Sequence, residues 1–172
     1  MKENNQYLAT NQTMGLFPIH HPTFQTKIYD RDNIFYSTQS PMEIIEETCL
    51  TRGASYEGRV QSVRTMLNYP YKTPLLLCQM EMLCAFPTMS PTSNENVWIF
   101  PNHIKYFSKS LRHVSVTFLN DETVTVKCSI AAFTKQYGKT ITCQSYFLTH
   151  PLHPTPTPRL YIGTRGQVPR PK

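Results

Sequence analysis

The residues best suited to chemistry in this sequence are cations around a short segment enclosed by two glycines. Tyr56 lies between Gly53 and Gly58, and Glu57 is the one carboxylate beside it. Glycine lets a main chain approach a polyanion closely, and arginine and lysine contact phosphate oxygens. The candidate nucleic-acid contacts in this part of the chain are Arg52, Tyr56, Arg59, Arg64 and Lys72. The alternative interpretation of the same residues is a solvated basic face that keeps the protein soluble.

A second set of cations follows the tryptophan, Trp98, and consists of Lys105, Lys109 and Arg112. The formal net charge is +6, and all 11 acidic residues stand at or before Glu122, so the rest of the chain carries positive charge only. A basic half of this kind attracts a polyanion or an anionic membrane surface, or it serves solubility alone.

Catalysis and metal binding find less support. The sequence contains no G-x-S-x-G, no P-loop and no H-E-x-x-H motif. Cys78 and Cys84 are not spaced like the cysteine pairs of structural zinc sites. We therefore expect buried, unpaired thiols at Cys49, Cys78, Cys84, Cys128 and Cys143, no metal or other cofactor, and no enzymatic activity. A cysteine hydrolase or a zinc protein is the last-ranked alternative.

A helix must position the first set of cations. Ser40 is placed as its N-cap, Pro41 suits the first helical position, and Glu43 can complete a capping box. Gly53 stands where a left-handed residue commonly ends a helix. These signals predict a helix over about 41–52.

The regions around this helix combine strands with two more helical patterns. We expect a loop over 54–59, a short helix over 60–67 and a second long helix near 130–148. Alternating apolar and β-branched residues predict strands at 27–30, 34–37, 75–79, 82–86, 114–119 and 123–128. The sequence is typical of the α+β class with a mainly antiparallel β-sheet, and Trp98 is expected in its core.

Composition divides the chain into three parts. Residues 1–23 are expected to be a flexible segment in which only 16–19 docks, residues 24–150 a single domain that carries both sets of candidate nucleic-acid contacts, and residues 151–172 a proline-rich basic tail. No stretch approaches the roughly 18 apolar residues that a membrane helix needs, and no secretory signal is present. We expect a cytoplasmic, reduced protein with no membrane partner.

Several spaced motifs of this chain are similar to the competence transcription factors of the ComK type. The resemblance covers about Ile34 to Phe147, and its central element is a cysteine followed by G-x-x-Y-x-G-[RK]. The matching residues are Pro41, Ile44, Ile45, Cys49, the GASYEGR segment at 53–59, Pro74 before 75–77, Phe86-Pro87-Thr88 with Ser90 and Thr92, Asn96 with Val97-Trp98-Ile99, and the 116–120 stretch.

The resemblance implies a sequence-selective DNA-binding activator of competence and DNA-uptake genes. Such a protein recognises paired A·T-rich boxes in double-stranded DNA, largely from the minor groove, as a homo-oligomer. Its level is controlled by an adaptor of an ATP-dependent protease, and it is nucleoid-associated when bound. Arg52, Arg59 and Arg64 would then enter the groove, where A·T tracts make the potential most negative, and Lys105, Lys109 and Arg112 would contact the backbone.

Two departures from the family pattern keep an alternative open. Residues 151–172 are proline-rich where the family carries a partly helical segment, and residues 1–23 have no clear counterpart. A divergent paralogue with these features could be an interaction protein that does not bind DNA and modulates a full-length relative by mixed oligomerisation.

Overall fold

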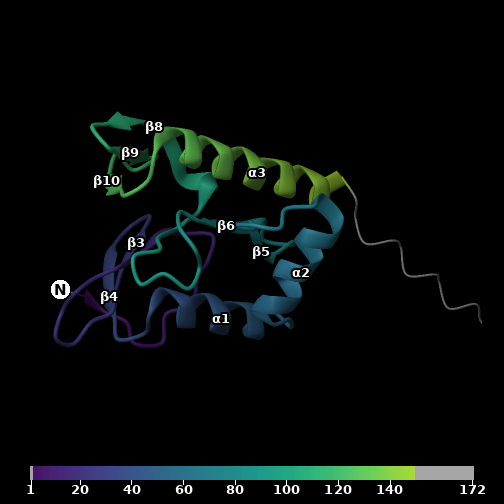
Figure 1. The fold of residues 1–172 in the computed structure, drawn as a ribbon. Helices are drawn as coiled ribbons and strands as arrows, with labels where there is room; N and C mark the ends of the chain where they lie inside the picture. The colour runs from purple at the N-terminus through teal and green to yellow at the C-terminus, as the bar shows by residue number, and fades with distance from the viewer. Residues whose placement is uncertain (1, 150–172) are drawn as a thin grey trace, which may run out of the picture.

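The computed structural model describes residues 2–149, which form an α+β fold with mostly antiparallel pairing (Figure 1). The strands are β1 (Lys2–Glu3), β2 (Thr13–Pro18), β3 (Thr26–Asp30), β4 (Ile34–Ser37), β5 (Leu75–Cys78), β6 (Leu83–Pro87), β7 (Trp98–Ile99), β8 (Ile104–Ser110), β9 (His113–Phe118) and β10 (Thr123–Val126). The helices are α1 (Pro41–Thr51), α2 (Tyr56–Leu67) and α3 (Ile130–Thr149), and a short 3-10 turn covers Pro101–His103. The predicted fold class is confirmed. The predicted tail at 151–172 lies outside the described residues.

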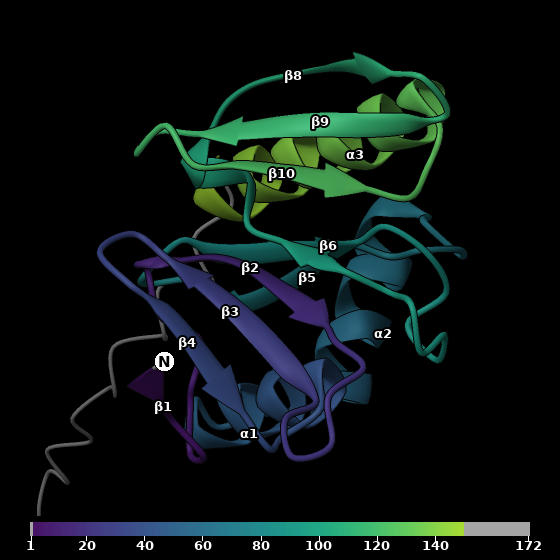
Figure 2. The same ribbon diagram turned by 90° about the vertical axis from the view of Figure 1, so that its left-hand side faces the viewer.

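The strands form two sheets. The larger has the order β1-β4-β3-β2-β7-β6-β5, and every neighbouring pair is antiparallel except β1 and β4. The smaller has the order β10-β9-β8. Figure 2 shows the small sheet above β2, β3 and β4, with α3 behind it and α1 behind the lower strands. The helices therefore cover one side of the sheets, with α1 and α2 at one end and α3 at the other.

Helix α1 forms as its sequence predicts. The Ser40 hydroxyl accepts a hydrogen bond from the Glu43 amide at 3.2 Å, and the Glu43 carboxylate accepts one from the Ser40 amide at 2.6 Å. Gly53 has φ +81°, a left-handed conformation that favours glycine. The apolar side chains Ile45 and Cys49 of α1 are fully buried in the cluster that this helix forms with the large sheet.

The predicted loop over 54–59 is wrong from residue 56 onward, because α2 already begins at Tyr56. Ser55 is the N-cap, and its hydroxyl accepts a hydrogen bond from the Gly58 amide at 3.1 Å. Glu57 places a carboxylate in the first turn, where the helix dipole favours negative charge. The glycine that suggested a loop thus lies inside a capped first turn, and the predicted helix over 60–67 is confirmed as its continuation.

The expectation of a flexible N-terminal segment is also wrong for residues 2–23. Strand β2 lies inside the large sheet between β3 and β7, and its side chains Met14 and Leu16 are buried. Polar residues of this segment find hydrogen-bond partners within the fold, since the Tyr7 hydroxyl bonds to Thr13 at 2.6 Å and donates to Asp30 of β3 at 2.8 Å. The polar composition of residues 1–23 therefore gave no indication that this segment contains a core strand, β2.

Apolar side chains gather on both sides of the central strands. One cluster joins α1, α2 and the large sheet around Trp98, which is 1% exposed, as predicted for a core anchor. A second joins the small sheet, β6, β7 and α3 around Phe118 and Phe133. The predicted hairpin β9–β10 and the predicted helix near 130–148 are confirmed, and Val114, Val116 and Phe118 share the buried face of β9.

Candidate nucleic-acid interface

Arg52 is the C-cap residue of α1, and its guanidinium group lies within the fold. One terminal nitrogen donates to the carbonyl oxygen of Ala9 at 3.0 Å and forms an ion pair with Glu81 at 2.9 Å. The side chain is only 16% exposed. Arg52 thus links the end of α1 to the N-terminal segment and to the β5–β6 turn, and its charge is already paired.

Arg59 has a similar position on α2. Its terminal nitrogens donate to the carbonyl oxygens of Arg52 at 2.8 Å and of Leu76 at 3.2 Å. The group also lies beside Cys49, whose pKa burial raises to about 11 although Arg59 opposes that rise. Arg59 therefore holds the α1–α2 connection against β5. Its guanidinium group is engaged by these main-chain bonds, whereas the sequence led us to expect it in a DNA groove.

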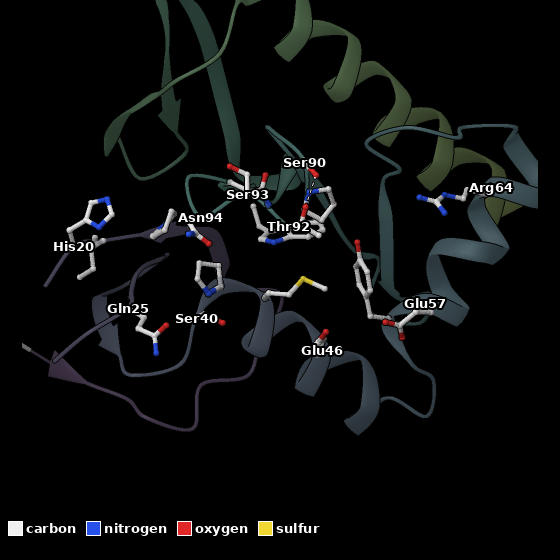
Figure 3. A pocket seen from close by; sticks show the side chains of 18 residues that line it. His20, Gln25, Ser40, Glu46, Glu57, Arg64, Ser90, Thr92, Ser93 and Asn94 are labelled. Carbon is white, nitrogen blue, oxygen red and sulfur yellow. Dashed lines mark hydrogen bonds between the residues drawn. The ribbon is translucent and has the colours of Figure 1, made fainter. Parts of the chain in front are cut away.

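Tyr56 and Arg64 line a surface groove of about 870 Å³ between α1, α2 and the 88–97 loop. The Tyr56 ring packs edge-on to Trp98 with 6.3 Å between ring centroids. Arg64 is exposed, and its Nε donates to the Thr73 hydroxyl at 3.1 Å. Figure 3 shows Glu46 and Glu57 on the helical side of the groove, across from Ser90, Thr92, Ser93 and Asn94.

Two carboxylates that line this groove would repel a polyanion bound in it. Glu46 and Glu57 both lie on the wall that carries Tyr56, and both raise the pKa of that tyrosine, although burial is the larger cause. Neither carboxylate forms a hydrogen bond or ion pair with the residues 2–149 that the structure describes. The helical wall of the groove is therefore unsuited to phosphate, and Arg64 is the residue of this wall that could approach DNA.

Lys72 belongs to a cluster of cations that we call the α3 basic cluster, consisting of Lys72, Lys135 and Lys139. The Gln136 side chain joins the 68–74 connection to α3 by donating to the carbonyl oxygen of Lys72 at 2.7 Å. Burial lowers the pKa of Lys139, and the neighbouring Lys135 and Lys72 lower it further. Lys72 and Lys139 donate to main-chain carbonyl oxygens, and Lys135 is exposed.

No carboxylate is paired with the α3 basic cluster among the described residues. Three like charges held together without a counter-charge cost free energy, which a bound polyanion would recover. Lys135 and Lys139 are the members that sequence reasoning left out of the candidate site. Their spacing of four residues on one helix face, together with the absence of acidic residues from that half of the chain, was the available signal.

The second set of predicted contacts, Lys105, Lys109 and Arg112, is divided between the two ends of the β8–β9 hairpin. Lys105 lies near the β9–β10 turn and forms an exposed ion pair with Asp121 at 2.6 Å. Lys109 and Arg112 lie at the other end, around the β8–β9 turn, and both are exposed. Neither forms an ion pair with any residue in the range 2–149. This end of the hairpin is therefore a second surface with free positive charge.

The cysteines offer no metal centre in the part of the chain that is described. Cys49, Cys84 and Cys143 are buried, and Cys78 and Cys128 are half-buried. Within residues 2–149 no group of three or more histidine, cysteine, aspartate or glutamate side chains is placed to hold a metal ion. None of the helices over these residues is long and apolar enough to cross a bilayer.

Comparison with known proteins adds a family to this geometry. The model of a family described as ComK protein matches residues 4–150. The competence transcription factor of Bacillus subtilis (strain 168) is 28% identical over 123 residues, which cover 71% of this chain and 64% of that relative. The match thus spans less than two thirds of the relative's length. No solved structure matches the chain. The family match begins at residue 4, in keeping with the place of β2 inside the large sheet.

Proposed function

The chain belongs to the ComK family, as its motifs predicted, and on that basis we propose that it is a DNA-binding transcription regulator of competence genes. The relative named as a competence transcription factor supports this function, and its name describes a regulator rather than an enzyme. The proposed ligand is A·T-rich double-stranded DNA, read largely from the minor groove. A narrow A·T groove has a strongly negative potential, which attracts arginine and lysine side chains.

The α3 basic cluster is the observation on this molecule that favours a polyanion. Its three lysines have no carboxylate partner among residues 2–149, and they lie on a helix and a loop that are fixed to each other through Gln136. We assign the DNA-facing surface to Lys72, Lys135 and Lys139, with Arg64 at one edge and the Lys109 and Arg112 end of the hairpin at another. Arg52 and Arg59 are left out because their guanidinium groups are held between segments of the fold. Tyr56 is left out because its ring packs against Trp98, and Lys105 because Asp121 neutralises its charge.

The remaining parts of the proposal follow from the family resemblance. The protein acts as a homo-oligomer, since paired boxes on DNA are matched by paired protein surfaces. Its abundance is controlled by an adaptor that delivers it to an ATP-dependent protease. It is located in the cytoplasm and associates with the nucleoid when it is bound to DNA.

Equilibrium binding to matched duplexes tests this function. Fluorescence anisotropy would compare an A·T-box duplex with a duplex of equal length in which the boxes are replaced by G·C pairs, with a minor-groove-binding drug as competitor. We expect tighter binding to the A·T duplex and displacement by the drug. Equal affinity for both duplexes, or no binding, would contradict the proposal. Absence of DNA binding together with co-elution with a full-length ComK relative would favour the mixed-oligomer alternative.

A further inference from the structure

The β8–β9 turn places an apolar side chain in solvent at the end of a hairpin. Leu111 is 89% exposed, and its backbone has φ +53°, in the left-handed region that glycine and asparagine adopt more readily than leucine. Neither packing nor local backbone preference explains leucine at this position. An exposed apolar residue in an unfavourable conformation suggests a role outside the folded core.

The surroundings of Leu111 are basic. Lys109 precedes it by two residues, Arg112 follows it, and His113 begins β9. The stretch 104–119 contains no aspartate or glutamate, and the nearest acidic side chain in sequence, Asp121, pairs with Lys105 at the far end of the hairpin. The turn therefore combines an apolar tip with flanking cations. This composition suits a ligand that has anionic groups on its outside and apolar surface in its interior.

Another exposed apolar turn in the molecule lacks this combination. Met80, in the β5–β6 turn, is 96% exposed, but the adjacent residue is Glu81, which pairs with Arg52. The cations around Leu111, rather than exposure alone, distinguish the β8–β9 turn. Met80 consequently supplies a matched control for the effect of removing a solvent-exposed apolar side chain from a turn.

The hairpin is held firmly enough to present its tip. Strands β8 and β9 pair from Ile104↔Phe118 to Ser110↔His113, so the register continues to the turn. The inner face of β8 packs on α3, because the centroid of the Phe107 ring lies 4.8 Å from the ring centroid of Phe133 and 5.5 Å from that of Tyr137. Figure 2 shows β8 and β9 as an extended ribbon in front of α3. A β-ribbon of this kind fits a DNA groove.

We propose that the β8–β9 turn enters the minor groove of A·T-rich DNA and that Leu111 wedges between two base pairs, unstacking them and bending the duplex. Lys109 and Arg112 contact the phosphates on either side of the wedge. Apolar side chains inserted from the minor groove kink DNA in this way, and flexible pyrimidine–purine steps are the least costly to open. The inference rests on the proposed DNA-binding function and adds to it the residue that deforms the DNA.

Base unstacking can be measured directly with A·T-box duplexes that carry 2-aminopurine at successive single positions. At saturating wild-type protein we expect its fluorescence to rise several-fold at one step in the box. Leu111→Ala should still bind at saturation and should lose that rise, with affinity reduced roughly tenfold. Leu111→Asn, which suits the left-handed backbone, should fold at least as stably as the wild type and lose the rise as well.

Three outcomes distinguish the wedge from the underlying function. Loss of the fluorescence rise in both Leu111 variants, with wild-type behaviour of Met80→Ala, would support the wedge. Selective binding to the A·T duplex with an undiminished rise in Leu111→Ala would overturn the wedge and leave the proposed function intact. Absence of any A·T-selective binding by the wild-type protein would overturn both.

Discussion

Arg52 and Arg59 hold three segments of the chain together through main-chain carbonyl oxygens. Arg52 reaches Ala9, and Arg59 reaches both Arg52 and Leu76. The Nε atom of each guanidinium is buried without a hydrogen-bond partner in the described structure. Such partly desolvated cations depend on the bonds that their terminal nitrogens form, because an unpaired buried charge is costly.

Replacement of Arg59 by alanine should therefore affect stability rather than DNA contact. We expect Arg59→Ala to lower the free energy of unfolding by about 3 kcal/mol, since it removes two charge-assisted hydrogen bonds and leaves their carbonyl acceptors without a donor. Urea denaturation would measure this change. Arg112→Ala, at an exposed residue, is the matched control and should unfold like the wild type. Wild-type stability of Arg59→Ala combined with weakened DNA binding would restore the sequence-based expectation that Arg59 enters the groove.

Sequence patterns could identify Arg52 and Arg59 as candidate functional residues, but they could not show that both side chains bond within the fold. Their partners are carbonyl oxygens from positions 9, 52 and 76, and a carbonyl group has no residue-type signature. Lys135 and Lys139, by contrast, lie in a part of the chain without acidic residues, so their lack of a carboxylate partner nearby in sequence could have been inferred. Whether a cation pairs inside the fold or remains available depends on long-range contacts that only the structure supplies.

At the scale of elements, the helices were predictable where caps and periodicity agreed. The S-x-x-E pattern at 40–43 fixed the start of α1, and the alternation of valines predicted β9 and β10. The start of α2 was missed because Gly58 suggested a loop, although Ser55 is a good N-cap. Strand β2 was missed because its neighbours in sequence are polar and because one of its two sheet partners, β7, lies about eighty residues further along the chain.

The place of β2 in the large sheet leads to a stability prediction. Leu16 is fully buried in the cluster under α1, so Leu16→Ala should lower the free energy of unfolding by about 3 kcal/mol, from lost burial and the cavity left behind. Chemical denaturation would test this against Leu50→Ala, an exposed position on α1 where the change should stay within about 0.5 kcal/mol. Equal stability of the two variants would place β2 outside the core.

At the scale of the molecule, charge is separated between two surfaces. The groove beside α1 and α2 carries the unpaired Glu46 and Glu57, whereas Lys72, Lys135 and Lys139 gather at α3 without a counter-charge among the described residues. Net charge predicted attraction to a polyanion, but only the packing of α3 on β6 and on the 68–74 connection brings these lysines together. We therefore propose that the DNA-facing surface lies at α3 and the adjoining hairpin end.

The most direct test of this account measures affinity for A·T duplex over a salt series in two charge-matched double variants. One carries Lys135→Gln and Lys139→Gln in the α3 basic cluster, and the other carries Lys2→Gln and Lys105→Gln, whose side chains bond to Asn33 and Asp121. Each phosphate contact contributes about 0.9 to the slope of log affinity against log salt concentration. We predict that the cluster variant makes this negative slope shallower by about 2 and that the control variant retains the wild-type slope. Equal slopes in the two variants would contradict the assignment of the α3 basic cluster to DNA.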